Sequence, residues 1–267
     1  MIKHVEFSKH LLNHWGDDPK GKYLWIHWDE KWFWGHVNRH AKVCEQLGLE
    51  PQQRFAFHKN HINKVMGIAV IYFAFEGSPN NGGVGGKIAF SRVQATKIAA
   101  KRQRAATKNA STGAIEYKGA ILREAGDPYS VDCAVTGSNV GTSYDPKFAL
   151  TEFFPLVMDE VEKLVKPGGK FAGYKPVFQG DRAGPHIEDK FLKYVTDECE
   201  KRKWLWEPQA PQMPHLNAND LGAFPAMSKR HTRLTRESGS MVPSKQVIWN
   251  AAVQVWNTLP ASVIARR

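Results

Sequence analysis

Three short segments of the chain each place one aspartate among aromatic, glycine, proline or histidine residues: WDEKWFW (28–34), QGDRAGPH (179–186) and MPHLNANDLGAF (213–224). The aspartates are Asp29, Asp181 and Asp220. They are far apart in sequence, and a fold that gathers them would create a cluster of carboxylates. Carboxylate oxygens are ligands for hard divalent cations, and Mg²⁺ is usually held by one or two carboxylates together with phosphate oxygens of a substrate. The segments therefore predict a divalent-cation site.

Each aspartate is expected at the boundary of a secondary-structure element. Asp29 closes an apolar run that begins at Tyr23, Asp181 ends the run 171–178, and Asp220 follows a proline-punctuated loop where a helix would begin. Ordinary structural roles are also open: a strand-end acid, a turn former near glycine, or an acid favoured by the helix macrodipole. Glu30 should point to the opposite face of the strand from Asp29 and is interpreted as structural.

These motifs resemble the catalytic domain of mariner-type DNA transposases, in the branch found in protist-like elements. The matching residues are DEKWF at 29–33, DRAGPH at 181–186, and PHLNAND at 214–220 followed by Phe224. Further likeness runs through KIAFSRV (87–93), SKRHT (228–232) and the closing TLPASVIARR. The resemblance thus covers most of residues 20–267.

The resemblance implies an α/β, ribonuclease H-like core: a mixed five-stranded sheet flanked by helices over residues 21–267, after a lead segment or linker at 1–20. It implies cleavage and strand transfer of double-stranded DNA by two Mg²⁺ or Mn²⁺ ions about 4 Å apart, in an in-line attack on a phosphodiester. Asp29 would bridge both ions, and Asp181 and Asp220 would each anchor one. Transposon ends and target DNA are the implied partners, with a possible homodimer and, in a eukaryote, a nuclear location.

The sequence departs from the family pattern in four respects. The asparagine that usually follows the second aspartate is Arg182, whose guanidinium could weaken cation binding or clamp a phosphate, and the usual SPD aspartate is His215. The 152 positions between Asp29 and Asp181 imply an insertion, expected at about 77–147. Only about 20 residues precede the first motif, so the helix-turn-helix modules of the family are expected to be missing. The alternative is therefore a catalytically inactive, domesticated DNA-binding or scaffold protein.

Hydrophobic periodicity predicts the elements that would position the motifs. Residues 66–75 form a continuous apolar run typical of a buried strand. A lead helix is expected at 5–15, and a break is expected at Pro225 in the helix after Asp220, whose N-cap would be Asn217 or Asn219. The remaining expected elements are a strand, turn and second strand over 22–34, a helix over 148–165, a strand over 170–179, a helix over 187–203, a strand over 204–206 and a helix over 245–259.

Composition and charge favour a folded protein with a polyanionic partner. The chain has 267 residues, 42% of them apolar, and a net charge of +11, which would also suit a ribosomal or membrane-surface protein. Three irregularly spaced cysteines indicate a reducing compartment, and no signal peptide or membrane span is expected. The basic segment 87–108 is the expected site of phosphate contact, unless it is only a solvated face. The expected DNA-binding residues are Lys87, Arg92, Lys97, Lys101, Arg102, Arg104, Arg182 and His186.

Overall fold

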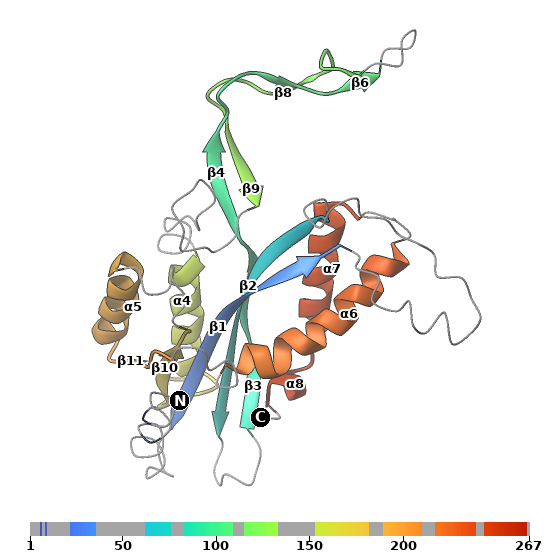
Figure 1. Ribbon diagram of the computed structural model, residues 1–267. Helices are drawn as coiled ribbons and strands as arrows, with labels where there is room; N and C mark the ends of the chain where they lie inside the picture. The colour runs from blue at the N-terminus through green and yellow to red at the C-terminus, as the bar shows by residue number, and fades with distance from the viewer. Residues whose placement is uncertain are drawn as a thin grey trace, which may run out of the picture.

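A computed structural model (Figure 1) describes residues 6, 9, 22–35, 62–75, 83–108, 115–132, 153–181, 189–209, 217–238 and 243–265. The lead helix expected at 5–15 lies almost wholly outside the described residues.

The centre of the molecule is a five-stranded mixed sheet. Its strands are β1 (Tyr23–Trp34), β2 (Lys64–Phe75), β3 (Gly83–Arg92), β10 (Lys175–Gln179) and β11 (Leu205–Trp206), in the spatial order β11-β10-β1-β2-β3. β2 is antiparallel to both β1 and β3, whereas β10 is parallel to β1 and β11 is parallel to β10. The expected ribonuclease H-like α/β core is thereby confirmed.

Both faces of the sheet are buried, which explains the continuous apolar run in β2. Side chains of a strand alternate between faces. Accordingly, Ile68 and Val70 pack in one core with Trp28, while Ala69 and Ile71 pack in the other with Phe33. Trp28 meets Phe154 edge to face at 5.3 Å between ring centroids.

Helices cover the two faces of the sheet in separate groups (Figure 1). The face with Trp28 packs against α4 (Phe154–Val165) and α5 (Asp189–Lys201). The face with Phe33 packs against a π-helical turn, η6 (Asn219–Ala223), and then α6 (Phe224–Glu237), α7 (Lys245–Thr258) and α8 (Ala261–Ala265). None of the described helices is both long enough and apolar enough to cross a membrane.

Two sequence expectations about the strands are wrong. Residues 22–34 do not contain a turn, because β1 runs through the polar stretch Asp29–Lys31 and pairs with β2 from Leu24 to Trp34. Residues 83–92 were expected within the insertion, but they form β3 and pair with β2. The part that projects from the sheet therefore starts only after Arg92.

The projecting part is a twisted two-stranded ribbon, here called the ribbon and comprising residues 94–108 and 115–132 (Figure 1). It is built from three successive antiparallel pairs: β4 (Gln94–Ile98) with β9 (Pro128–Asp132), β5 (Gln103–Arg104) with β8 (Ile121–Arg123), and β6 (Thr107–Lys108) with β7 (Ile115–Glu116).

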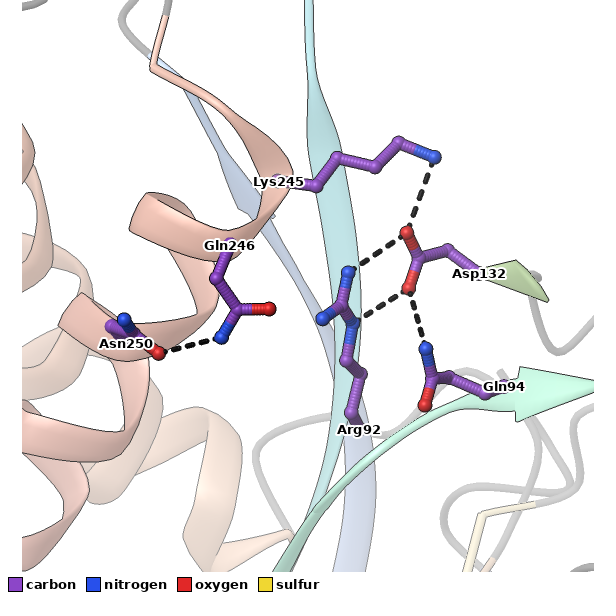
Figure 2. A network of polar contacts seen from close by, with 6 residues as sticks. All are labelled: Arg92, Gln94, Asp132, Lys245, Gln246 and Asn250. Atoms are coloured by element: carbon purple, nitrogen blue, oxygen red, sulfur yellow. Dashed lines mark hydrogen bonds and ion pairs between the residues drawn. The ribbon is translucent and has the colours of Figure 1, made fainter. Parts of the chain in front are cut away.

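An ionic cluster holds the base of the ribbon (Figure 2). Arg92, the last residue of β3, donates to both carboxylate oxygens of Asp132 at 2.6 and 2.9 Å. Lys245, at the start of α7, lies 3.2 Å from the same carboxylate, and Gln94 donates to it at 3.4 Å. One carboxylate thus joins the end of β9 to β3, β4 and α7.

Candidate functional site

The pairing of β1 with β10 places two of the three aspartates beside each other. The parallel register joins His27 to Gln179. Asp29 lies two residues after His27, at the middle of β1, and Asp181 lies two residues after Gln179, just beyond the end of β10. Because neighbouring strands lie about 4.8 Å apart, this register brings the two residues level with each other at the sheet.

Asp220 lies near the same place, although it belongs to the C-terminal part of the chain. It is the second residue of η6, the π-helical turn that leads directly into α6. The expected break at Pro225 takes the form of this change from π to α geometry, with Pro225 in the first turn of α6, where a missing N–H costs nothing. When one of the two carboxyl groups is protonated, Asp220 and Asp29 can share a side-chain hydrogen bond. The structure therefore brings together the three aspartates that the sequence motifs singled out.

The carboxylates repel one another in a partly desolvated environment. Burial, followed by the charges of Glu30, Asp220 and Asp181, raises the pKa of Asp29 above its ordinary value. The Glu30 backbone N–H opposes this effect by donating to Asp29 Oδ1 at 2.7 Å. Burial also raises the pKa of Asp220, against the hydrogen bond with Asp29 and the charge of Lys31. A nearby cation would stabilise the ionised form of a cluster of carboxylates such as this one.

Lys31 is a member of the site that the sequence analysis missed. It lies two residues after Asp29, so strand alternation places both side chains on one face of β1. Its Nζ lies 5.4 Å from the centroid of the Phe224 ring at the start of α6. Burial lowers the pKa of Lys31, while the charges of Asp220 and Asp29 act in the opposite direction. Its position two residues after Asp29 in the same strand was the sequence signal that could have identified Lys31.

The donor set fits a hard divalent cation in its chemistry, since all three side chains offer carboxylate oxygens. Among the described residues, however, no group of three or more His, Cys, Asp or Glu side chains is placed so that it could hold a metal ion. The arrangement is a bonded pair, Asp29 and Asp220, with Asp181 near enough to influence both pKa values.

Two of the expected DNA-binding residues have structural partners instead. Lys87 Nζ donates to the main-chain carbonyls of Trp256 and Asn257, at 2.8 and 3.0 Å, near the C-terminal end of α7. A cation at this end of a helix is favoured by the helix macrodipole. Arg92 is largely buried in the pair with Asp132. Lys87 and Arg92 therefore have contacts within the domain, at the end of α7 and at the base of the ribbon.

The other expected DNA-binding residues are on the ribbon or outside the described residues. Lys97, Lys101 and Arg102 are exposed, and Arg102 pairs with Glu124 at 2.6 Å. Arg104 is half-buried and donates to the Gly119 carbonyl at 3.3 Å. Arg182 and His186 lie outside the described residues.

The fold and the site define a ribonuclease H-like domain with an acidic cluster at the centre of its sheet. No family model matches the chain, and no curated protein matches it either. Among solved structures, the chain is similar to the Mos1 Strand Transfer Complex, with a TM-score of 0.46 and 13% identity over 100% of this chain and 56% of that chain. It is also similar to the Mos1 transposase paired-end complex with left transposon end, with a TM-score of 0.41 and 13% identity over 98% of this chain and 61% of that chain.

A third similar structure is the catalytic domain of Mos1 mariner transposase, with a TM-score of 0.35 and 12% identity over 98% of this chain and 90% of that chain. The chain spans about three fifths of the length of the Mos1 chains in the two complexes. At 12–13% identity and TM-scores below 0.5, these similarities do not assign a function to the chain.

Proposed function

We propose that this domain cleaves and joins DNA strands in a divalent-metal-dependent reaction, as the catalytic domain of a mariner-type transposase. The observation that carries the proposal is the meeting of Asp29, Asp181 and Asp220 at the centre of the sheet, from segments that are far apart in sequence. Polyanionic DNA suits a chain with a net charge of +11.

In this proposal the chain's own residues have distinct tasks. Asp29, Asp181 and Asp220 would together hold the divalent cations, because their carboxylates lie near enough for their charges to act on one another. When bound, Mg²⁺ or Mn²⁺ would activate a water or a 3′-hydroxyl and stabilise the leaving oxygen of the phosphodiester. Lys31 would offset the negative charge of Asp29 and Asp220 and attract the DNA phosphate toward them.

The ribbon would provide contacts to the DNA backbone. The ribbon extends away from the sheet (Figure 1), and it carries the exposed cations Lys97, Lys101 and Arg102. Contacts of lysine and arginine with phosphate position a protein on DNA but do not read base sequence directly. We therefore expect this domain to bind duplex DNA with little sequence preference.

A nicking assay tests the proposal directly. Supercoiled plasmid is incubated with the purified chain in Mn²⁺, Mg²⁺ or EDTA, and the relaxed and linear forms are quantified. Asp29→Asn and Asp220→Asn should each abolish metal-dependent nicking. Asp159→Asn, an exposed aspartate on α4, removes the same charge away from the site and should nick like the wild type.

A second measurement separates loss of chemistry from loss of DNA binding. Fluorescence anisotropy with a labelled duplex should give the same affinity for the wild type and Asp29→Asn, within about twofold, because removal of a carboxylate does not weaken attraction to phosphate. If the wild type binds duplex DNA but never nicks it with either metal, the domain is instead the catalytically silent DNA-binding protein named above.

A further inference from the structure

We infer that Asn217 and Asn219 are positioning residues that fix Asp220 against Asp29. The inference rests on the proposed function for its catalytic meaning, but its structural content can be tested without metal or DNA. Neither asparagine is expected to touch a cation or a substrate. Both act through the backbone of the strand that carries Asp29.

The two asparagine side chains tie η6 to consecutive residues of β1. Asn217 Nδ2 donates to the main-chain carbonyl of Trp28 at 3.1 Å, one residue before Asp29. Asn219 Nδ2 donates to the carbonyl of His27 at 3.3 Å, two residues before Asp29. These bonds join residues about 190 positions apart, so the spacing between Asp29 and Asp220 depends on them rather than on local chain geometry.

A second set of bonds makes this connection rigid. Asn217 Oδ1 accepts the Asn219 backbone N–H at 3.0 Å, so one amide group contacts both the strand and the turn. The Ala218 N–H donates to His27 Nδ1 at 3.5 Å.

The π-helical geometry gives the bonds their effect on Asp220. The Phe224 N–H donates to the Asn219 carbonyl, five residues back, which is the hydrogen-bond spacing of a π-helix. A π-turn holds one more residue than an α-turn, so conversion to α geometry would rotate Asp220 relative to α6. Asn219 begins this turn and is fixed to β1, and its anchoring therefore sets the direction in which Asp220 points.

The burial of these polar groups indicates a purpose other than stability. Asn217 and Asn219 are 1% and 0% exposed. Within the described part of the chain, Asn219 Oδ1 and His27 Nε2 are buried without a hydrogen-bond partner. An apolar side chain would avoid the cost of such unsatisfied groups, which is roughly 1–3 kcal/mol for each. Asn219 thus carries a cost in stability for its unsatisfied oxygen, whereas both polar atoms of the Asn217 amide have partners.

The test compares asparagines that make the same kind of bond in different places. Asn217→Leu removes the amide at nearly constant size, and Asn217→Ser is a milder variant if the leucine variant fails to fold. Asn63→Leu is the matched control, because Asn63 Nδ2 also donates to a distant main-chain carbonyl, that of Pro243, at 3.0 Å. All three proteins are compared with the wild type by thermal unfolding.

The first readout is hydrogen exchange of the metal-free protein. Asn217→Leu or Asn217→Ser should speed exchange in residues 217–223 by about tenfold or more relative to β2, as expected for local opening of a turn that has lost its anchor. Asn63→Leu should leave that stretch unchanged. Unchanged exchange in both Asn217 variants would overturn the positioning role, whatever the metal measurements show.

The second readout is Mn²⁺ affinity, measured by isothermal titration calorimetry. Loss of groups that orient metal ligands typically weakens metal affinity by about 10–100-fold. We expect that loss for the Asn217 variants and an affinity within about twofold of wild type for Asn63→Leu. Equal weakening in all three variants would overturn the inference, since it would reflect general destabilisation. If the wild type binds no Mn²⁺, the proposed function fails, while the exchange experiment still decides whether these asparagines position Asp220.

Discussion

Replacement of Asp29 by asparagine should stabilise the metal-free protein while it removes the metal response. Asp29 lies in a desolvated position beside Glu30, Asp220 and Asp181, and all three raise its pKa. Asparagine has nearly the same shape and can still accept the Glu30 N–H through its side-chain oxygen. The substitution therefore replaces a group that must take up a proton to remain in this position by a neutral one, without a change in packing.

The magnitude follows from the shift of the pKa from 3.8 to about 8. Because the folded pKa exceeds the unfolded one, the folded state binds the proton more tightly, and stability is lost as pH rises from 3.8 toward 8. At pH 7, at about 1.36 kcal/mol per pH unit, the full penalty is roughly 4 kcal/mol. Asp29 and Asp220 share the hydrogen bond, and asparagine keeps some desolvation cost, so we expect about half of this, ~2 kcal/mol.

Differential scanning fluorimetry at pH 7 in EDTA checks the prediction. A gain of ~2 kcal/mol corresponds to a Tm increase of about 4–8 °C for a domain of this size. The gain should shrink as the pH is lowered toward 4. Addition of Mn²⁺ should raise the Tm of the wild type, since a ligand at 100 times its Kd adds about 2.7 kcal/mol, and leave Asp29→Asn unchanged. A lower Tm for Asp29→Asn in EDTA would refute the account of repelling carboxylates.

Three further outcomes are expected. Asp132→Asn, unlike Asp29→Asn, should lower the free energy of unfolding in urea by about 3 kcal/mol, because it removes the negative charge that both Arg92 and Lys245 contact. An unchanged free energy of unfolding would contradict the structural role of this ionic cluster. Gly180→Ala should cost about 1–3 kcal/mol and reduce nicking, because the new methyl group would collide with the Trp28 indole beside Asp181. Two triple variants test the ribbon: Lys101, Arg102 and Arg104 changed to Ala, and, as control, Lys163, Lys193 and Lys201 changed to Ala. The ribbon variant should reduce the slope of log K for DNA binding against log salt by about 2–3 relative to the control. Equal slopes would leave the ribbon without a role in DNA binding.

The sequence predicted those elements whose environment is uniform along their length. Met66–Phe75 was identifiable because β2 lies at the interior of the sheet and is covered on both faces, which requires apolar residues at every position. β3 was missed because it is an edge strand of the described sheet and is rich in glycine and polar residues. At Gly86 a larger residue would collide with the Tyr72 ring of β2, so packing selects a residue with low strand propensity.

The candidate site was predictable only in part for a related reason. The motif aspartates could be named from sequence, but the partners of Lys87 and Arg92 lie 169 and 40 positions away, and no local pattern reveals them. Basic residues in a charged run therefore looked alike, although two of them stabilise α7 and the base of the ribbon. The π-turn was likewise hidden, because its geometry is fixed by bonds to β1 rather than by its own sequence.

The distance in sequence between Asp29 and Asp220 has a consequence during protein synthesis. The two residues are 191 positions apart, with Asp181 between them. A growing chain exposes β1 and the ribbon before η6 and α6 have emerged, and domains generally complete their packing only when the whole unit is available. Under the proposed function, an unfinished chain could attach to nucleic acid but would lack the residues to cut it.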